Sequence, residues 1–210
     1  MRPCPDFKPG VATFLRGAFR PLRTSWEVVG TAAQCSGIWW AAVNPWPDRS
    51  KLPILAVDVD GVVSLFGFEG APPASLGRVH LVDGIPHFIS AGAGERLRRL
   101  IDHYELVWAT GWEERANDYL PTILGLPMLP FLRFGGDARF GSAHWKLGPI
   151  EEFAQGRPLA WIDDSLTDEC YEWARQRPDP TLLVPTEPVR GIEEAHVEAL
   201  LRWAEDGYRL

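Results

Sequence analysis

Runs of apolar residues, each followed by small or charged residues, recur through the chain after residue 50. The stretch ILAV at residues 54–57 contains no polar side chain, which is typical of a strand buried on both faces of a parallel sheet. Comparable runs lie at residues 106–109, 159–162 and 181–184, and a further strand is expected near residues 128–134. Helical patterns cover residues 90–103, with Ser90 as the cap, residues 167–177 and residues 192–204, and further helices begin near residues 113 and 146. This alternation predicts an α/β fold with a doubly wound, parallel, Rossmann-like sheet.

A β-hairpin is expected between the first two of these strands. Asp83 and Gly84 form a turn pair flanked by strand-like residues 78–82 and 85–89, whereas residues 64–75 are expected to be loop. His80 and His87 lie on this hairpin, where flexible polar residues without a special role are common. About fifty residues separate Asp60 from Thr110, so no large inserted domain fits there.

Two carboxylates follow the first strand directly. Successive strand residues point to opposite faces, so the side chains of Asp58 and Asp60 are expected to share one face and to lie about 6.6 Å apart at the ideal rise. Two like charges so close require a cation between them or a proton on one of them. The simpler alternative is that the sequence DVDG only forms a turn.

Three further polar groups follow in order along the chain. Thr110 and Gly111 follow the second strand, Lys146 lies at a helix start, and Asp163 with Asp164 ends a later strand. Taken singly, these residues are also explained as a strand-end cap, an exposed helix residue and the cap of the next helix. Because the carboxyl ends of parallel strands share one edge, Thr110, Asp163 and Asp164 are expected to meet there with Asp58.

In this order the four motifs resemble those of the haloacid dehalogenase-like (HAD) superfamily: an Asp-x-Asp-Gly strand, a Ser/Thr strand, a Lys and an acidic strand end. The resemblance covers residues 53–205. More narrowly, WATGWEERAND, LGLP, Trp145-Lys146, LAWIDD and TLLVPT are similar to the compact HAD domain of Swiss Army Knife RNA repair proteins. The resemblance implies a HAD-type sheet with a β-hairpin flap and no large cap domain.

The resemblance further implies a magnesium-dependent phosphatase that acts through an aspartyl-phosphate. Asp58 would be the nucleophile, and Asp60 would protonate the leaving group and then activate water. Thr110 and Lys146 would hold the phosphate.

Mg²⁺ is the implied cofactor. Its ligands would be Asp58, the backbone carbonyl of Asp60, and Asp164, with Asp163 close by. Which of Asp163 and Asp164 binds the ion directly is left open.

An open site favours a large substrate, such as a nucleotide or an RNA end. The candidates for contacting it are Gly111, Trp112, Arg115 and Asn117. Trp112 is expected at the rim, where an aromatic ring can stack on a base, and Trp108 in the core. The alternatives are a small-metabolite phosphatase or phosphotransferase, and a non-catalytic binding module with the same fold.

Composition and charge restrict these possibilities further. The chain is 46% hydrophobic and 23% charged, which is typical of a globular protein. Residues 1–50 hold six Lys/Arg against three Asp/Glu, which leaves 15 against 25 for residues 51–210. We therefore expect an acidic catalytic domain without an extended nucleic-acid surface, preceded by a poorly ordered or loosely packed extension. Residues 28–43 carry no formal charge but are too short and too polar for a typical span, which favours a cytoplasmic protein over a targeted or membrane-anchored one.

Overall fold

The computed structural model describes residues 51–135 and 141–208. The prediction of an amino-terminal extension at residues 1–50 lies outside the described residues. Among the helices that are described, none is both long and apolar enough to cross a membrane.

The main sheet is parallel and four-stranded. Its order is β5 (Glu105–Trp108), β1 (Ile54–Val57), β6 (Leu159–Asp163) and β7 (Thr181–Pro185). β1 therefore lies inside the sheet, between β5 and β6, and both registers are continuous along its length. The residues that follow β1 consequently have a strand end on either side of them.

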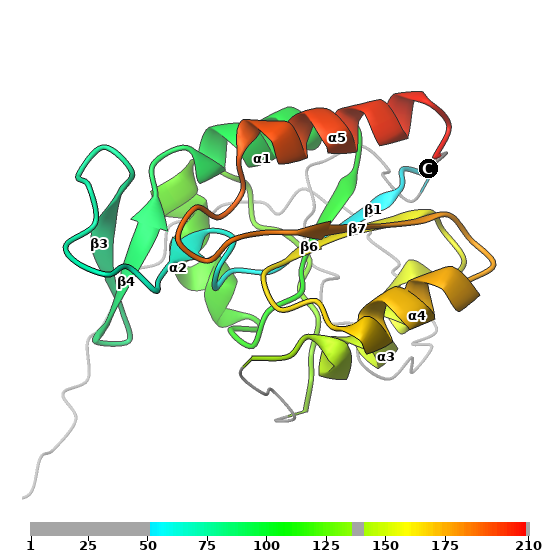
Figure 1. The fold of residues 1–210 in the computed structure, drawn as a ribbon, viewed down its shortest axis with the longest axis horizontal. Coiled ribbons are helices and arrows are strands. Elements are labelled where there is room, and N and C mark those ends of the chain that lie inside the picture. The colour runs from blue at the N-terminus through cyan, green and yellow to red at the C-terminus, as the bar shows by residue number, and fades with distance from the viewer. Residues whose placement is uncertain (1–50, 136–140, 209–210) are drawn as a thin grey trace, which may run out of the picture. The chain divides into compact units, whose positions relative to one another are not determined.

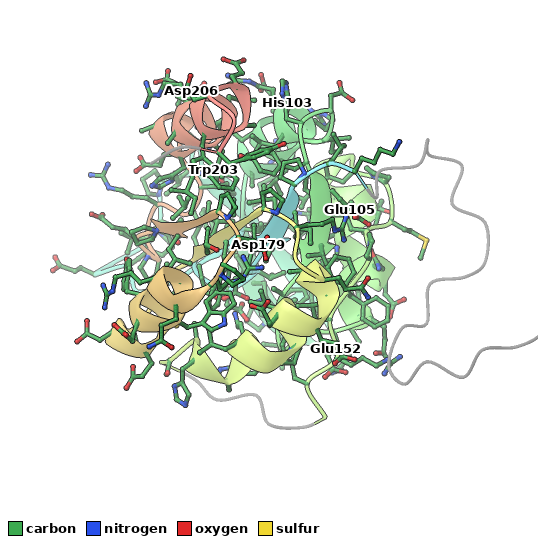
Figure 2. All side chains as sticks on the ribbon, turned by 90° about the vertical axis from the view of Figure 1, so that its right-hand side faces the viewer. His103, Glu105, Glu152, Asp179, Trp203 and Asp206 are labelled. Atoms are coloured by element: carbon green, nitrogen blue, oxygen red, sulfur yellow. The ribbon has the colours of Figure 1, made fainter. Side chains whose placement is uncertain are left out.

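Helices cover both faces of this sheet. One face is covered by α1 (Ala93–Leu100), α2 (Arg115–Leu124) and α5 (Glu194–Glu205), and the other by α3 (Leu147–Ala154) and α4 (Asp168–Gln176). Figure 1 shows α1 and α5 above the sheet and α3 and α4 below it. Figure 2 looks toward the edge where the strands begin, with Glu105 and Asp179 at that edge and Trp203 on α5. This layering confirms the predicted α/β fold with a parallel sheet.

The two cores follow from the alternation of side chains along the strands. In β1, Leu55 and Val57 belong to the core under α1, α2 and α5, whereas Ile54 and Ala56 belong to the core over α3 and α4. Every residue of β1 is buried, so a run without polar residues is what a two-sided sheet requires. Trp108 of β5 was predicted to lie in the core, and its side chain is fully buried.

A small antiparallel sheet lies beside the carboxyl ends of the main strands. It has the order β2 (Ser64–Leu65), β4 (Ile85–Ser90) and β3 (Gly77–Val82), and it is seen at the left of Figure 1. The predicted hairpin is confirmed, and Asp83 and Gly84 at its tip both have positive φ, as a type I′ turn requires. We call β3 and β4 the flap.

Several predicted boundaries were wrong. Ser90 is the last residue of β4 rather than a helix cap, because its backbone N–H donates to Val63 and its register with Gly77 continues the flap. The expected strand at residues 128–134 is reduced to one bridge between Phe131 and Trp108, since the prolines at positions 127 and 130 cannot donate to a longer ladder.

Two strand limits also differ from the predictions. Residues 64–75 are not all loop, because Ser64 and Leu65 pair with β4. β1 ends at Val57, so the strand does not continue through Asp58 and Asp60.

Candidate active site

Three carboxylates meet at the carboxyl edge of the main sheet. Asp58 follows β1, Asp163 is the last residue of β6, and Asp164 comes next. One oxygen from each lies within 4.8 Å of the others. The neighbouring strands β1 and β6 bring them together, because Ile162 pairs with Val57 and accepts the backbone N–H of Asp58. The predicted convergence of these three residues is therefore confirmed.

Lys146 lies between two of the carboxylates. Its ammonium nitrogen is 2.9 Å from Oδ2 of Asp58 and 2.7 Å from Oδ2 of Asp163. A short 3₁₀ helix at His144–Lys146 leads directly into α3 and places the lysine so that only 3% of it is exposed. A lysine is rarely buried to this extent unless it is paired, so the two carboxylates account for its position.

Asp163 and Asp164 have different surroundings. Asp163 is fully buried, and both of its oxygens are engaged: Oδ2 also accepts the indole N–H of Trp161 at 3.2 Å, and Oδ1 accepts the backbone N–H of Ser165 at 2.9 Å. Asp164 is only partly buried, and its Oδ1 accepts the hydroxyl of Ser165 at 3.1 Å. Asp163 thus holds Lys146 in place, whereas Asp164 is closer to solvent.

The charges of this group are not balanced. Burial raises the pKa of Asp58 to about 7 from the usual 3.8, against the opposing charge of Lys146, and the charge of Asp163 raises it further. Burial, and then the charge of Asp163, also raise the pKa of Asp164. Burial alone would lower the pKa of Lys146, but Asp58 and Asp163 outweigh it and raise the pKa. Three carboxylates share one ammonium group, so the site has an excess of negative charge.

A hard divalent cation fits this arrangement. Carboxylate oxygens are the ligands that such ions prefer, and a second positive charge would balance the ionised forms of Asp58 and Asp164. The cluster can therefore hold a metal ion. The side chain of Asp60, which was predicted to share a face with Asp58, is not among the three.

The turn after Asp58 depends on Gly61. Its φ of +72° is in the left-handed region, and an added Cβ would overlap the side chain of Asp164. The hydroxyl of Thr186 donates to the carbonyl oxygen of Gly61 at 2.9 Å, which ties the turn to the end of β7. Gly61 thus allows the turn after β1 to lie against the carboxylate after β6.

We expect Gly61→Ala to displace Asp164 and weaken metal binding by about tenfold or more, which is the usual cost of disturbing the surroundings of a ligand. Gly84→Ala is the matched control, because Gly84 also has a positive φ of +82° but no atom within 4 Å of an added Cβ. Both variants should lose some thermal stability, and only Gly61→Ala should lose affinity for a divalent cation in calorimetric titration. Equal affinities in the two variants would contradict this role for Gly61.

Asp60 points toward the flap rather than toward the other carboxylates. Its Oδ2 accepts the indole N–H of Trp112 at 2.9 Å, and its Oδ1 lies 3.7 Å from Nδ1 of His87. His87 also shares a 3.0 Å hydrogen bond with the hydroxyl of Ser64, and its ring meets that of Trp112 edge to face at 4.6 Å between centroids. The side chains of Asp58 and Asp60, which both follow β1, therefore point in different directions.

Of the remaining predicted site residues, Thr110 and Gly111 follow β5, and Arg115 and Asn117 lie on α2. Thr110 is buried just beyond β5, next to the end of β1, and its hydroxyl oxygen is 3.4 Å from the backbone nitrogen of Trp112. Gly111 is exposed beside it. Arg115 is ion-paired with Asp83 at the tip of the flap. The side-chain amide of Asn117 makes two hydrogen bonds to the backbone of Leu129, so this residue holds a loop.

Sequence reasoning assigned no role to His87 or Ser64. The alternation within β4 was a usable signal, because it places His87 and Ile89 on the same face of the flap, and Ile89 is buried. What could not be read from the sequence is that this face is turned toward Asp60. That arrangement depends on the pairing of β4 with β2, which is only two residues long.

Comparison of the chain with models of protein families and with curated proteins found no match. The chemistry of the site is therefore inferred from its own residues.

Proposed function

We propose that this protein is a magnesium-dependent phosphomonoester hydrolase of the HAD-like type, in which Asp58 forms an aspartyl-phosphate. The observation that carries the proposal is the position of Lys146 between Asp58 and Asp163, with Asp164 within reach of the same point. A purely structural ion pair would need one carboxylate, and three impose a cost in the absence of a cation. The motif order described above agrees with the same chemistry.

Asp58 has the surroundings that a carboxylate nucleophile requires. The backbone N–H of Val59 donates to its Oδ1 at 2.8 Å, and Lys146 contacts its Oδ2. These contacts fix the orientation of the carboxylate, while burial removes water that would otherwise solvate it. The residue is reactive as the anion, and positive charge brought close to it favours that form.

The ion would be held by Asp58, by the backbone carbonyl of Asp60 and by Asp164, which is less buried than Asp163, with Asp163 close by. When bound, Mg²⁺ would neutralise charge on the transferring phosphoryl group and on the attacking carboxylate. Lys146 and Thr110 would hold the other phosphate oxygens, with Lys146 kept in position by Asp163.

Asp60 is proposed as the acid and base. In the first step Asp58 forms a bond to phosphorus, the bond from phosphorus to the leaving oxygen breaks, and Asp60 gives that oxygen its proton. In the second step a water molecule loses a proton to Asp60 and attacks phosphorus, and the bond to Asp58 breaks. Asp58 is then free, Asp60 is protonated again, and inorganic phosphate is released.

The preferred substrate is proposed to be a phosphate on a large and accessible molecule, such as a nucleotide or an RNA end. Within the described residues, the segment between β1 and β5 supplies only the small antiparallel sheet and α1 around the site. So little protein cannot enclose a small ligand, and binding energy must come from parts of the substrate beyond the phosphate. The acidic domain limits this to local contacts.

A panel of phosphorylated nucleotides, RNA ends and sugars tests the proposal. Phosphate release should require Mg²⁺, stop with chelator, and be more efficient with nucleotides or RNA ends than with small sugar phosphates. Equal or better efficiency with a sugar phosphate would favour a metabolite phosphatase. Transfer of phosphate to another hydroxyl without release would indicate a phosphotransferase, and binding without turnover of any substrate would indicate a binding module.

A further inference from the structure

Asp60 has a different environment from the three carboxylates of the metal cluster. Its side chain is 38% exposed, and its contacts come from Trp112 in the segment after β5 and from His87 on the flap. Neither Trp112 nor His87 belongs to the main sheet or to the acidic cluster. Both contacts bear on the residue proposed above as acid and base, so their chemistry determines how that residue can work.

The contact with Trp112 distinguishes the two oxygens of Asp60. An indole N–H can donate a hydrogen bond but cannot accept one. Oδ2 accepts this donor at 2.9 Å, so Oδ1 is the oxygen that remains able to exchange a proton with a substrate. The hydrogen bond also restrains rotation of the carboxyl group, which would otherwise exchange the two oxygens.

His87 borders the other oxygen without binding it closely. The distance of 3.7 Å from Nδ1 to Oδ1 is longer than a hydrogen bond, and Nδ1 is engaged with Ser64 at 3.0 Å instead. Ser64 itself forms a backbone bridge with Asp60 and begins β2, which pairs with β4. The flap and the turn that carries Asp60 are thus parts of one hydrogen-bonded unit. Within this unit the ring of His87 lies beside Oδ1 of Asp60.

We propose that Trp112 and His87 are positioning residues for Asp60, and that they direct the proton on Oδ1 to the leaving oxygen. This inference rests on the phosphatase function proposed above and assigns Trp112 a role other than stacking on a base. In the first step the proton leaves Oδ1 as the bond from phosphorus to the leaving oxygen breaks. In the second step Oδ1 takes the proton of the attacking water. Throughout, Oδ2 keeps the hydrogen bond from Trp112.

The test compares leaving groups, because a weaker acid matters only when the leaving oxygen needs a proton. Trp112→Phe keeps a ring against His87 but removes the N–H donor together with part of the indole ring, and the control below accounts for the lost volume. With an alkyl phosphate, kcat/KM should fall about tenfold or more, a fraction of the usual contribution of a general acid. With p-nitrophenyl phosphate, whose leaving anion is stable, the fall should be about threefold or less. Trp173→Phe on α4 is the matched control and should change neither value.

His87→Phe tests the flap side of the same arrangement. It removes Nδ1 and with it the hydrogen bond to Ser64, and it should show the same dependence on the leaving group as Trp112→Phe. His80→Phe, at the position paired with His87 across the flap, is its control. If Trp112→Phe lowers kcat/KM equally for both leaving groups, the loss reflects general structural damage and the proposal is overturned.

A measurement that needs no activity separates this inference from the proposed function. The indole N–H resonance of Trp112, identified by its loss in Trp112→Phe, should lie downfield in the wild-type protein and move upfield in Asp60→Ala. A resonance that does not move would refute the hydrogen bond, whatever the enzyme activity. A resonance that moves in a protein that releases no phosphate would refute the proposed function and the catalytic role of the contact together, and would leave only the geometry.

Discussion

Asp58→Asn is expected to abolish phosphate release, with a loss on the order of 10⁴-fold or more, as for removal of other catalytic nucleophiles. The amide keeps the shape of the carboxylate and its hydrogen bond from Val59, but it cannot form the aspartyl-phosphate and contributes no charge to a cation. Phosphate release by the purified variant under saturating Mg²⁺ is the measurement. Asp118→Asn, an exposed residue of α2, is the matched control and should retain full activity.

The same substitution should stabilise the protein when no metal is present. The folded pKa of Asp58, about 7, is above its unfolded value of 3.8, so the folded state binds more protons between these pH values. Stability is therefore lost as the pH rises from about 4 to about 7, and asparagine avoids this loss. Melting temperatures without metal should favour Asp58→Asn at pH 8 and converge below pH 4. Normal turnover by the variant would refute the nucleophile, and lower stability at pH 8 would refute the charge argument.

Lys146→Met is expected to destabilise the protein by about 3–5 kcal/mol, the usual cost of removing one partner from a buried ion pair. The change leaves Asp58 and Asp163 buried with no cation between them. Chemical denaturation at neutral pH measures the loss. Arg99→Met is a suitable comparison, because Arg99 and Glu194 form an exposed pair, for which about 1 kcal/mol or less is expected.

Two conditions should restore stability to Lys146→Met. Mg²⁺ should recover part of it by supplying positive charge to Asp58 and Asp164. A fall in pH should do the same, because proton uptake removes the repulsion between the carboxylates. Activity should stay low in both conditions, since the contact with phosphate is missing. A variant as stable as the wild-type protein at pH 8 without metal would show that Lys146 does not balance the buried carboxylates.

The sheet and the acidic edge were predictable because they depend on local signals. A strand such as ILAV, buried on both faces, has no other good position in a protein of this size, and the carboxyl ends of parallel strands must share an edge. Asp58, Asp163 and Asp164 could therefore be grouped without knowing their distances, whereas Lys146, at the start of a helix, was placed with them only by the order of the motifs. Asp60 could not be placed in the same way, because β1 ends at Val57 and the alternation stops before it.

The contacts of His87 with Ser64 and Trp112 could not be predicted from the sequence for a related reason. They join residues 64, 87 and 112, which are distant along the chain and are brought together by a two-residue strand and a turn. Nothing in the local pattern specifies such a short strand. The expected substrate contacts of Arg115 and Asn117 illustrate the same limit, since a polar residue near a site is equally suited to holding a loop in place.

The tip of the flap is anchored to the start of α2. Asp83 is ion-paired with Arg115 and accepts the hydroxyl of Tyr119 at 2.8 Å, although these residues are more than thirty positions apart. A charge reversal or loss at Asp83 removes this partner from both Arg115 and Tyr119, so the three residues form a single unit of variation. Among descendants of a common ancestor, the identities of residues 83, 115 and 119 should change together, because the anchoring of the flap tip depends on all three.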